Sequence, residues 1–313
     1  MPCRKLEGHT AKVSCILHLP GGQRIMTCSY DGSLRVWNSE SGAQIGDDWR
    51  DGESAVIALA LSPDGKKVAS GSGDGAVRLW DMETSKVITK WTGHVGSVKS
   101  LCWNRDGERV VSGSFDGTAR VWDVKSGEVI LGPLHTGYDV DAVVYSPDNS
   151  MIATGVVTFP EKDYIRIWDE KTGELIINLR GHQYTVTCLA WSADGRMLFS
   201  GSLGDSIKMW NTTTWQPIAN FNHASSALAI AISPNGCFLA SALFDGTARL
   251  WSIEDGQPIG SPVQHPKSVS CLSFSANGNI LATGCSDNNA YLSDISQMSR
   301  EHQVGLSELP DVG

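Results

Sequence analysis

Long hydrophobic stretches are missing from this sequence of 313 residues: no run approaches a membrane span, and the first residues contain no apolar signal segment. Basic residues are also scarce, since 25 lysines and arginines stand against 34 aspartates and glutamates, which gives a net charge of −9. This balance argues against a broad surface for nucleic acid or for an anionic membrane. We therefore expect an intracellular protein, cytoplasmic or nuclear, that binds neither nucleic acids nor membranes.

The common signatures of catalytic and cofactor sites are absent as well. The sequence contains no H-E-x-x-H, C-x-x-C or G-x-x-x-x-G-K motif. Residues Gly71–Ala76 partly imitate a dinucleotide-binding loop, but they lead into an expected strand, whereas phosphate binding of that type needs a helix N-terminus. We expect no enzyme activity, no cofactor and no metal site.

Eight cysteines are present, but their placement does not favour a disulfide framework. Cys15, Cys188 and Cys271 occupy equivalent positions of one repeated segment, and most of the others lie in or beside apolar strand patterns. Cysteines in such positions behave as small hydrophobic residues, and disulfides are rare inside cells. We interpret them as buried thiols.

Helical periodicity is lacking too, and short strand patterns take its place. Segments such as Val13–Leu17 and Val98–Trp103 are rich in β-branched or aromatic residues and are bounded by turn formers. Between such segments lie triplets such as Pro63–Gly65 and Pro234–Gly236, in which glycine or asparagine accepts a positive φ. The chain is predicted to be all-β.

Tryptophan is the residue that organises the sequence. Six tryptophans recur at intervals of 41 to 46 residues, and each ends a segment of the kind SFDGTARVWD, at 114–123. A seventh copy, SDNNAYLSD at 286–294, has serine in place of the tryptophan. A period of about 40–45 residues with a G-H…W-D frame resembles the WD40 repeat family. The six tryptophans are Trp37, Trp80, Trp122, Trp168, Trp210 and Trp251.

The resemblance implies a seven-bladed WD40-type β-propeller with four antiparallel strands in each blade. The last repeat ends at its third strand, so the N-terminal segment Cys3–Leu6 is expected to close the last blade and protect its edge. Residues 1–295 are assigned to the propeller and residues 296–313 to a polar C-terminal tail. We expect the chain to be a monomer by itself.

A histidine, a serine or threonine, an aspartate and a tryptophan recur from blade to blade and imitate a hydrolase triad. The resemblance implies a structural hydrogen-bond network inside the blade, because a buried polar cluster is stable only when every member has a partner. Complete sets are expected in the first, third and sixth repeats. The second, fourth and seventh repeats lack a member and the fifth inverts Asp-Gly to Gly204-Asp205, so these four blades are expected to be locally softer. The complete sets are His9, Thr27, Asp31 and Trp37; His94, Ser112, Asp116 and Trp122; and His223, Ser241, Asp245 and Trp251.

In WD40 proteins, partners commonly meet the face that carries the turns between the second and third strands, together with the start of the innermost strands. We call it the upper face. Residues matching these positions include aromatic and aliphatic candidates for interface anchors. A longer fourth-repeat turn, Val156–Asp163, adds an acidic lobe suited to orienting a basic peptide. The predicted partner-binding residues are Lys12, Tyr30, Lys99, Phe115, Asp139, Asp141, Glu161, Leu203, Leu228 and Phe244.

The function predicted from these patterns is that of a non-catalytic scaffold that binds a protein or peptide. One alternative is a substrate receptor of a cullin-type ubiquitin ligase, although the W-D-x-R signature of many such receptors is not met: residues 122–125 read W-D-V-K. Another is a small-molecule-binding or enzymatic propeller that uses the central channel. Phrases such as GEVILGPLH and GQPIGSPVQH also resemble stand-alone fungal WD40 proteins and the sensor regions of fungal NLR-like proteins.

Overall fold

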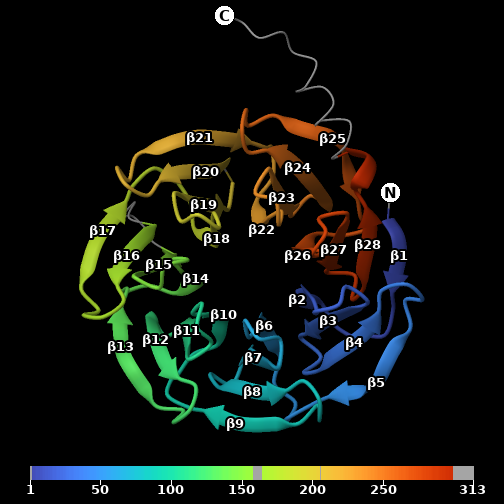
Figure 1. The fold of residues 1–313 in the computed structure, drawn as a ribbon, viewed down its shortest axis with the longest axis horizontal. Coiled ribbons are helices and arrows are strands. Elements are labelled where there is room, and N and C mark those ends of the chain that lie inside the picture. The colour runs from blue at the N-terminus through green and yellow to red at the C-terminus, as the bar shows by residue number, and fades with distance from the viewer. Residues whose placement is uncertain (1, 158–163, 205, 299–313) are drawn as a thin grey trace, which may run out of the picture.

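The computed structural model describes residues 2–157, 164–204 and 206–298, which form seven four-stranded antiparallel sheets around a central axis (Figure 1). This arrangement confirms the predicted seven-bladed β-propeller. In each of the first six blades, four consecutive strands run from the centre to the rim, so the first strand lines the channel and the fourth forms the outer edge. Within the described residues, no helix is long and apolar enough to span a membrane.

The strand bounds follow the repeats closely. Blades 1 to 3 are built from β2 (Val13–His18), β3 (Arg24–Ser29), β4 (Leu34–Asn38), β5 (Gln44–Trp49); β6 (Val56–Leu61), β7 (Lys67–Ser72), β8 (Val77–Asp81), β9 (Val87–Trp91); and β10 (Val98–Trp103), β11 (Arg109–Ser114), β12 (Thr118–Asp123), β13 (Val129–His135). Blades 4 to 6 are built from β14 (Val140–Tyr145), β15 (Met151–Val156), β16 (Ile165–Asp169), β17 (Leu175–Leu179); β18 (Val186–Trp191), β19 (Met197–Ser202), β20 (Ser206–Asn211), β21 (Pro217–Asn222); and β22 (Ala227–Ile232), β23 (Phe238–Leu243), β24 (Thr247–Ser252), β25 (Pro258–Gln264).

Blade 7 is assembled from both ends of the chain. It contains β26 (Val269–Phe274), β27 (Ile280–Cys285) and β28 (Ala290–Asp294), and its outer strand is β1 (Pro2–Leu6). β1 pairs antiparallel with β28, with Lys5 opposite Tyr291 and Leu6 opposite Ala290. The predicted closure by Cys3–Leu6 is therefore confirmed, and the strand begins one residue earlier.

The hydrophobic core lies between neighbouring blades rather than within one. Trp80 of blade 2 packs in a cluster made mainly of blade 1 residues, and Trp122 of blade 3 packs likewise against blade 2. The blades approach each other so closely that a side chain at Gly71 would clash: its Cβ would lie 2.6 Å from Cγ1 of Val98 in the next blade. Each repeat thus buries its apolar face only by stacking on its neighbour, as repeat proteins require.

The segment that follows the propeller begins differently from the polar tail that the sequence suggests. Ile295 is 1 % exposed, residues 296–298 form a short helical turn, and Met298 packs against the hydrophobic cluster between blades 6 and 7. Met298 thus packs against the propeller, while residues 299–313 lie outside the described residues.

Seven cysteines are free thiols, and most of them are buried or half-buried: Cys15, Cys28, Cys102, Cys188, Cys237, Cys271 and Cys285. Burial raises the pKa of Cys188 to about 12 and the pKa of Cys271 above its ordinary value. Cys237 differs from the expectation because it is exposed, at the end of the hairpin turn that precedes β23.

Candidate partner-binding site

The upper face is built by one repeated backbone contact. The residue after the second strand of each blade donates its amide to a carbonyl that lies just before the innermost strand. Tyr30 donates to Lys12 at 3.1 Å, and Phe115 donates to Ser97 at 3.0 Å. The turn that follows is tight because its glycine adopts a positive φ, 77° at Gly117. Each blade therefore presents these two positions side by side at the same height.

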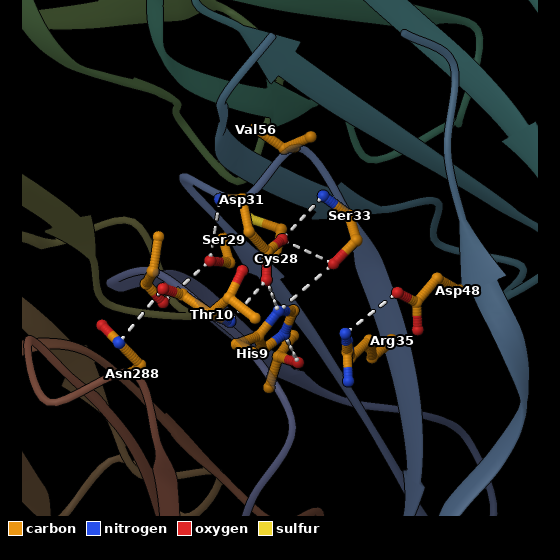
Figure 2. A network of polar contacts seen from close by, with 12 residues as sticks. His9, Thr10, Cys28, Ser29, Asp31, Ser33, Arg35, Asp48, Val56 and Asn288 are labelled. Carbon is orange, nitrogen blue, oxygen red and sulfur yellow. Dashed lines mark hydrogen bonds and ion pairs between the residues drawn. The ribbon is translucent and has the colours of Figure 1, made fainter. Parts of the chain in front are cut away.

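The turns are held by the predicted network, which is complete in blade 1. Figure 2 shows the part of it around His9, Asp31 and Ser33. Trp37 Nε1 donates to Thr27 Oγ1 at 2.8 Å, Thr27 Oγ1 lies 2.7 Å from Nε2 of His9, and His9 Nδ1 lies 2.8 Å from Asp31. A carboxylate can only accept and an indole N–H can only donate, so the threonine hydroxyl donates to Nε2 and the histidine carries its proton on Nδ1. Asp31 also accepts from Ser33 in the turn itself.

Blade 3 repeats the same three contacts among four residues, at 2.8, 2.7 and 2.8 Å: Trp122 to Ser112, Ser112 to His94, and His94 to Asp116. The hydroxyls of Ser112 and of its blade 1 counterpart belong to side chains with no exposed surface. A hydroxyl sealed in this way is out of a substrate's reach. These residues therefore support the fold and are not a nucleophilic triad.

The remaining blades keep parts of the network. In blade 6, Trp251 donates to Ser241 at 3.0 Å and the ring of His223 lies 6.2 Å from that of Trp251. Asp245 accepts from the amide and the hydroxyl of Thr247, and the full sixth set stays a prediction. In blade 5, the histidine, serine and tryptophan are joined, while Asp205 lies outside the described residues: the joined set is His182, Ser200 and Trp210.

Blade 2 replaces the missing histidine by an arginine. Arg78 donates to both carboxylate oxygens of Asp74 in the turn, at 3.1 and 2.8 Å, and to Asp51 at 2.6 Å. The Asp74 hydrogen bonds raise the pKa of Arg78 and, together with the turn amide of Ala76, hold the pKa of Asp74 well below its usual range. This blade was predicted to be softer, but its turn has its own ionic support.

Blade 7 has a different substitution. His265 Nε2 lies 2.8 Å from Thr283, as in the other blades, but Tyr291 donates to Asp287 from the position that arginine holds elsewhere. Ser293 stands where the tryptophan would be, and its buried hydroxyl has no hydrogen-bond partner among the described residues. The network is thus incomplete here, as the sequence predicts.

Three aromatic side chains are exposed at the same position of three blades. Tyr30, Phe115 and Phe244 are 41 %, 44 % and 66 % exposed. Two of them are covered on one side by a lysine: Lys12 Nζ lies 5.7 Å from the centre of the Tyr30 ring, and Lys99 Nζ lies 4.4 Å from that of Phe115. Cation–π contact holds these rings in place without burying them.

The other predicted residues are less exposed, and Leu203 occupies the position in blade 5 that Tyr30 occupies in blade 1. Lys12, Lys99, Asp139 and Asp141 are half-buried, as are Leu203 and Leu228. Glu161 lies outside the described residues. In the fourth blade the position equivalent to Tyr30 is occupied by Val157, whose amide donates to Asp139 at 3.0 Å. The sequence predicts Glu161 for this face because the insertion in the fourth repeat leaves the register of its turn undefined.

The channel itself contains a cavity of about 260 Å³ lined by the innermost strands of all seven blades. Three of its hydroxyl groups are engaged by backbone carbonyls of the next blade, as in Ser14 to Val56 at 2.6 Å and Thr187 to Ala227 at 2.6 Å. Lys99 and Asp141 are the charged groups that line this cavity. Among the described residues, no group of three or more His, Cys, Asp or Glu side chains could hold a metal ion.

The charges at the channel mouth influence one another. Burial raises the pKa of Asp141, an effect that Lys99 opposes and Asp139 reinforces. Burial also lowers the pKa of Lys12, and Lys99 lowers it further, although Cys271 opposes both. The channel mouth therefore combines two cations, two carboxylates and an aromatic rim, and these groups are partly desolvated. Because the effective dielectric constant is lower there than in bulk water, the interaction energy with a charged group of a peptide is larger.

Two exposed apolar residues of this face were missed from the sequence. Val95 is 93 % exposed and Tyr184 is 53 % exposed. Val95 lies one residue after His94, and Tyr184 lies two residues after His182, in the loop that enters the innermost strand; the ring of Tyr184 covers Gly204. An apolar residue in an otherwise polar loop is the signal that could have identified them.

The fold and this face define a propeller whose rigid turns present aromatic and charged groups at one end. The family model described as WD domain, G-beta repeat, matches residues 1–38, 49–81, 85–123, 173–211, 215–252 and 256–294. The chain belongs to the WD40 repeat family. The longest stretch between matches, residues 124–172, contains the divergent fourth repeat.

Similar proteins share short parts of this chain. Apoptotic protease-activating factor 1 of Rattus norvegicus is 35 % identical over 86 residues, which is 27 % of this chain and 7 % of the relative. Pre-mRNA-processing factor 19 of Oryza sativa is 28 % identical over 116 residues, 36 % and 21 % of the two chains. Autophagy-related protein 16 of Arabidopsis thaliana is 30 % identical over 89 residues, 28 % and 18 %. The matched region is thus at most about a fifth of each of these relatives.

Replacing Asp116 by alanine is expected to lower the free energy of unfolding at pH 7 by about 1–3 kcal/mol, because buried donors on His94 and Thr118 lose their acceptor. Burial alone would raise the pKa of Asp116, but hydrogen bonds from Thr118 and His94 outweigh it and hold the pKa below its ordinary value of 3.8. A group with a depressed folded pKa stabilises the protein above the unfolded pKa and loses this contribution as the pH falls through the folded pKa.

Urea unfolding of the wild type and Asp116→Ala should therefore show a clear difference at pH 7 that shrinks towards pH 3. Glu128→Ala, which changes an exposed carboxylate on the lower turn of the same blade, serves as the control. Equal midpoints for the wild type and Asp116→Ala at pH 7 would contradict the structural role of the network.

Proposed function

We propose that this chain is a non-catalytic scaffold that binds a protein or peptide partner on its upper face. Propellers of this family typically serve as platforms for protein assembly. The observation that carries the proposal is the repeated exposure of Tyr30, Phe115 and Phe244 on turns held by buried hydrogen bonds. Rigid aromatic groups bind at low entropic cost and dominate interface energies.

The charges at the channel mouth specify the partner further. Asp139 and Asp141 lie on the fourth blade beside the aromatic rim, and the net charge of the chain is −9. We infer that a basic segment of the partner lies across this acidic side, where complementary charge would orient it. The apolar side chains of the partner then face the aromatic rings.

The names of the relatives refer to apoptosis, pre-mRNA processing and autophagy, so they do not single out one partner for this chain. Within this proposal the chain acts as a monomer inside the cell, in the cytoplasm or nucleus, and does not bind nucleic acid. The seven free thiols, most of them buried or half-buried, support an intracellular setting, since disulfides are rare there.

The experiment that tests the proposal is site-specific photo-crosslinking. A benzoylphenylalanine incorporated at Phe115 or at Phe244 should capture the same protein from a lysate, because both positions face one interface. The same probe at Ile218, an exposed residue on the outer strand of blade 5, is the matched control. A product that forms only at Ile218, or different products at the two phenylalanine positions, would oppose an upper-face site.

A further inference from the structure

The outer strands of six blades share an isoleucine that follows the residue paired with the blade's tryptophan. In five blades this side chain is 41–52 % exposed, and in blade 6 it is only 6 % exposed. In blades 1 and 6 this isoleucine pairs with the residue before the tryptophan, whereas in blades 2 to 5 it lies at a register shift. Blade 1 is therefore the like-for-like comparison, and its difference from blade 6 indicates that something covers the position in blade 6. The six residues are Ile45, Ile88, Ile130, Ile176, Ile218 and Ile259.

The cover in blade 6 is a methionine from the turn that follows β28. β25 bulges after Ile259, because Leu250 pairs with Ile259 while the next pair is Ala248 with Val263. Gly260 in this bulge has φ 61°, and a Cβ placed there would lie 3.1 Å from Cγ of Met298. Met298 thus occupies a packing site formed by an isoleucine, a bulged glycine and the turn of the next blade.

Blade 1 has an equivalent packing site. Val36 pairs with Ile45, the next pair is Leu34 with Trp49, and the bulged Gly46 has φ 70°. No atom lies within 4 Å of the position that a Cβ on Gly46 would take. The isoleucine and glycine that receive the methionine in blade 6 are therefore present in blade 1 without a cover.

The neighbouring turn explains why no side chain covers this packing site in blade 1. Met82 of blade 2 donates its amide to Lys66 at 3.0 Å, just as Ile295 donates to Asn279 at 2.8 Å in blade 7. Ser85 follows Met82 by three residues, and Met298 follows Ile295 by three residues. Ser85 is therefore the residue of blade 2 that is equivalent to Met298 of blade 7. The short side chain of Ser85 leaves a cavity of about 370 Å³ between β5 and the Met82–Ser85 turn, which we call the blade 1–2 groove.

The groove has an apolar floor and an acidic rim. Val36, Ile45, Trp49 and Met82 supply apolar surface, and the rim carries Asp47, Asp48 and Glu83 with one cation, Arg24. Asp48 is engaged by Arg35 at 2.9 Å and by Arg50 at 3.4 Å. Within the part of the chain that the structure describes, Asp47 and Glu83 form no ion pair. The rim therefore has two carboxylates available to a ligand.

We propose that the blade 1–2 groove is a second docking site, which binds a short peptide segment of a partner protein that carries a methionine flanked by lysine or arginine. The methionine takes the place that Met298 takes in blade 6, lying over Gly46 and against the ring of Trp49. A flexible thioether fills such irregular sites well and makes favourable contacts with aromatic rings. The basic neighbours face Asp47 and Glu83, which set the orientation of the segment.

The probe for this site is a nine-residue synthetic peptide with a central methionine, a lysine pair on either side, and alanine or serine elsewhere. The protein is labelled with 5-fluorotryptophan, and the signal of Trp49 in the fluorine spectrum is assigned with Trp49→Phe. Addition of the peptide should shift this signal saturably. Peptides with methionine replaced by alanine, or lysines by glutamates, should bind at least about tenfold more weakly, equivalent to about 1.4 kcal/mol.

Variants of the protein locate the binding. Ile45→Asp, and separately Asp47→Lys with Glu83→Lys, should raise the Kd at least about tenfold. Ile88→Asp is the control, because it places the same charge on the outer strand of blade 2, where the isoleucine that follows the partner of Trp80 is 50 % exposed. The Phe115→Ala, Phe244→Ala variant should bind the peptide as the wild type does, which separates this groove from the upper face.

Three results would overturn the proposal. The first is an unshifted Trp49 signal at saturating peptide, and the second is equal binding of the methionine and alanine peptides. The third is a concentration-dependent dimer, seen in analytical ultracentrifugation, that Ile45→Asp dissociates and Ile88→Asp does not. That outcome would assign the groove to a second copy of the chain.

Discussion

Removal of residues 1–6 is expected to lower the melting temperature by about 10 °C. Leu6 is 1 % exposed in the cluster between blades 7 and 1, and its burial contributes about 1.5–3 kcal/mol. The deletion also removes the backbone pairing of β1 with β28 and leaves β28 as an unprotected edge. A loss of several kcal/mol in a domain of this size corresponds to a shift of roughly 2–4 °C for each kcal/mol.

The matched control is deletion of residues 299–313, which leaves every described contact in place, including that of Met298 with blade 6. Differential scanning calorimetry of both truncated proteins makes the comparison. A less severe pair of variants, Leu6→Ala and Lys5→Ala, distinguishes burial from chain length, because Leu6 is buried and Lys5 is exposed. Similar, small shifts for the two deletions would contradict the closure of the ring by β1.

The fold was predictable because the same strand and turn patterns recur in seven repeats, so a departure in one repeat does not hide the pattern. The tryptophans occupy one position of the third strand, and in the structure they pack in equivalent places against the preceding blade. The closure of the ring was predictable from the number of strands: the seventh repeat contains only three, so the fourth strand of its blade must come from another part of the chain. Hydrogen-bond sets such as His9, Thr27 and Asp31 were predictable for the same reason: their spacing recurs in blade 3.

Features that depend on a single blade were not predictable. The ionic support of blade 2 joins Arg78 to Asp51, residues 27 positions apart whose proximity depends on how the loop before β6 folds. The place of Val157 in blade 4 depends on the register of a lengthened turn. Met298 belongs to a segment that repeats nothing, so no pattern in the sequence links it to Gly260. Such contacts arise from tertiary packing, which a periodic pattern does not contain.

The double variant Phe115→Ala, Phe244→Ala is expected to weaken partner binding by two orders of magnitude or more while leaving the melting curve nearly unchanged. Phe244 is 66 % exposed and Phe115 is 44 % exposed, so their removal opens no cavity in the core. In an interface, truncation of such an aromatic anchor costs about 2 kcal/mol or more, which is about 30-fold in Kd for each ring. Stability and binding should therefore separate.

The measurement combines thermal unfolding with the affinity for the partner captured by crosslinking at these positions. Lys125→Ala is the matched control, because it changes an exposed residue on the turn between β12 and β13, at the opposite end of the third strand from Phe115. Lys99→Ala adds a graded test: it removes the ammonium group that lies 4.4 Å from the Phe115 ring, so it should weaken binding less than loss of the ring itself. Full affinity of a folded double variant would exclude the upper-face aromatics as anchors and would leave the blade 1–2 groove as the stronger candidate for the site that holds the partner.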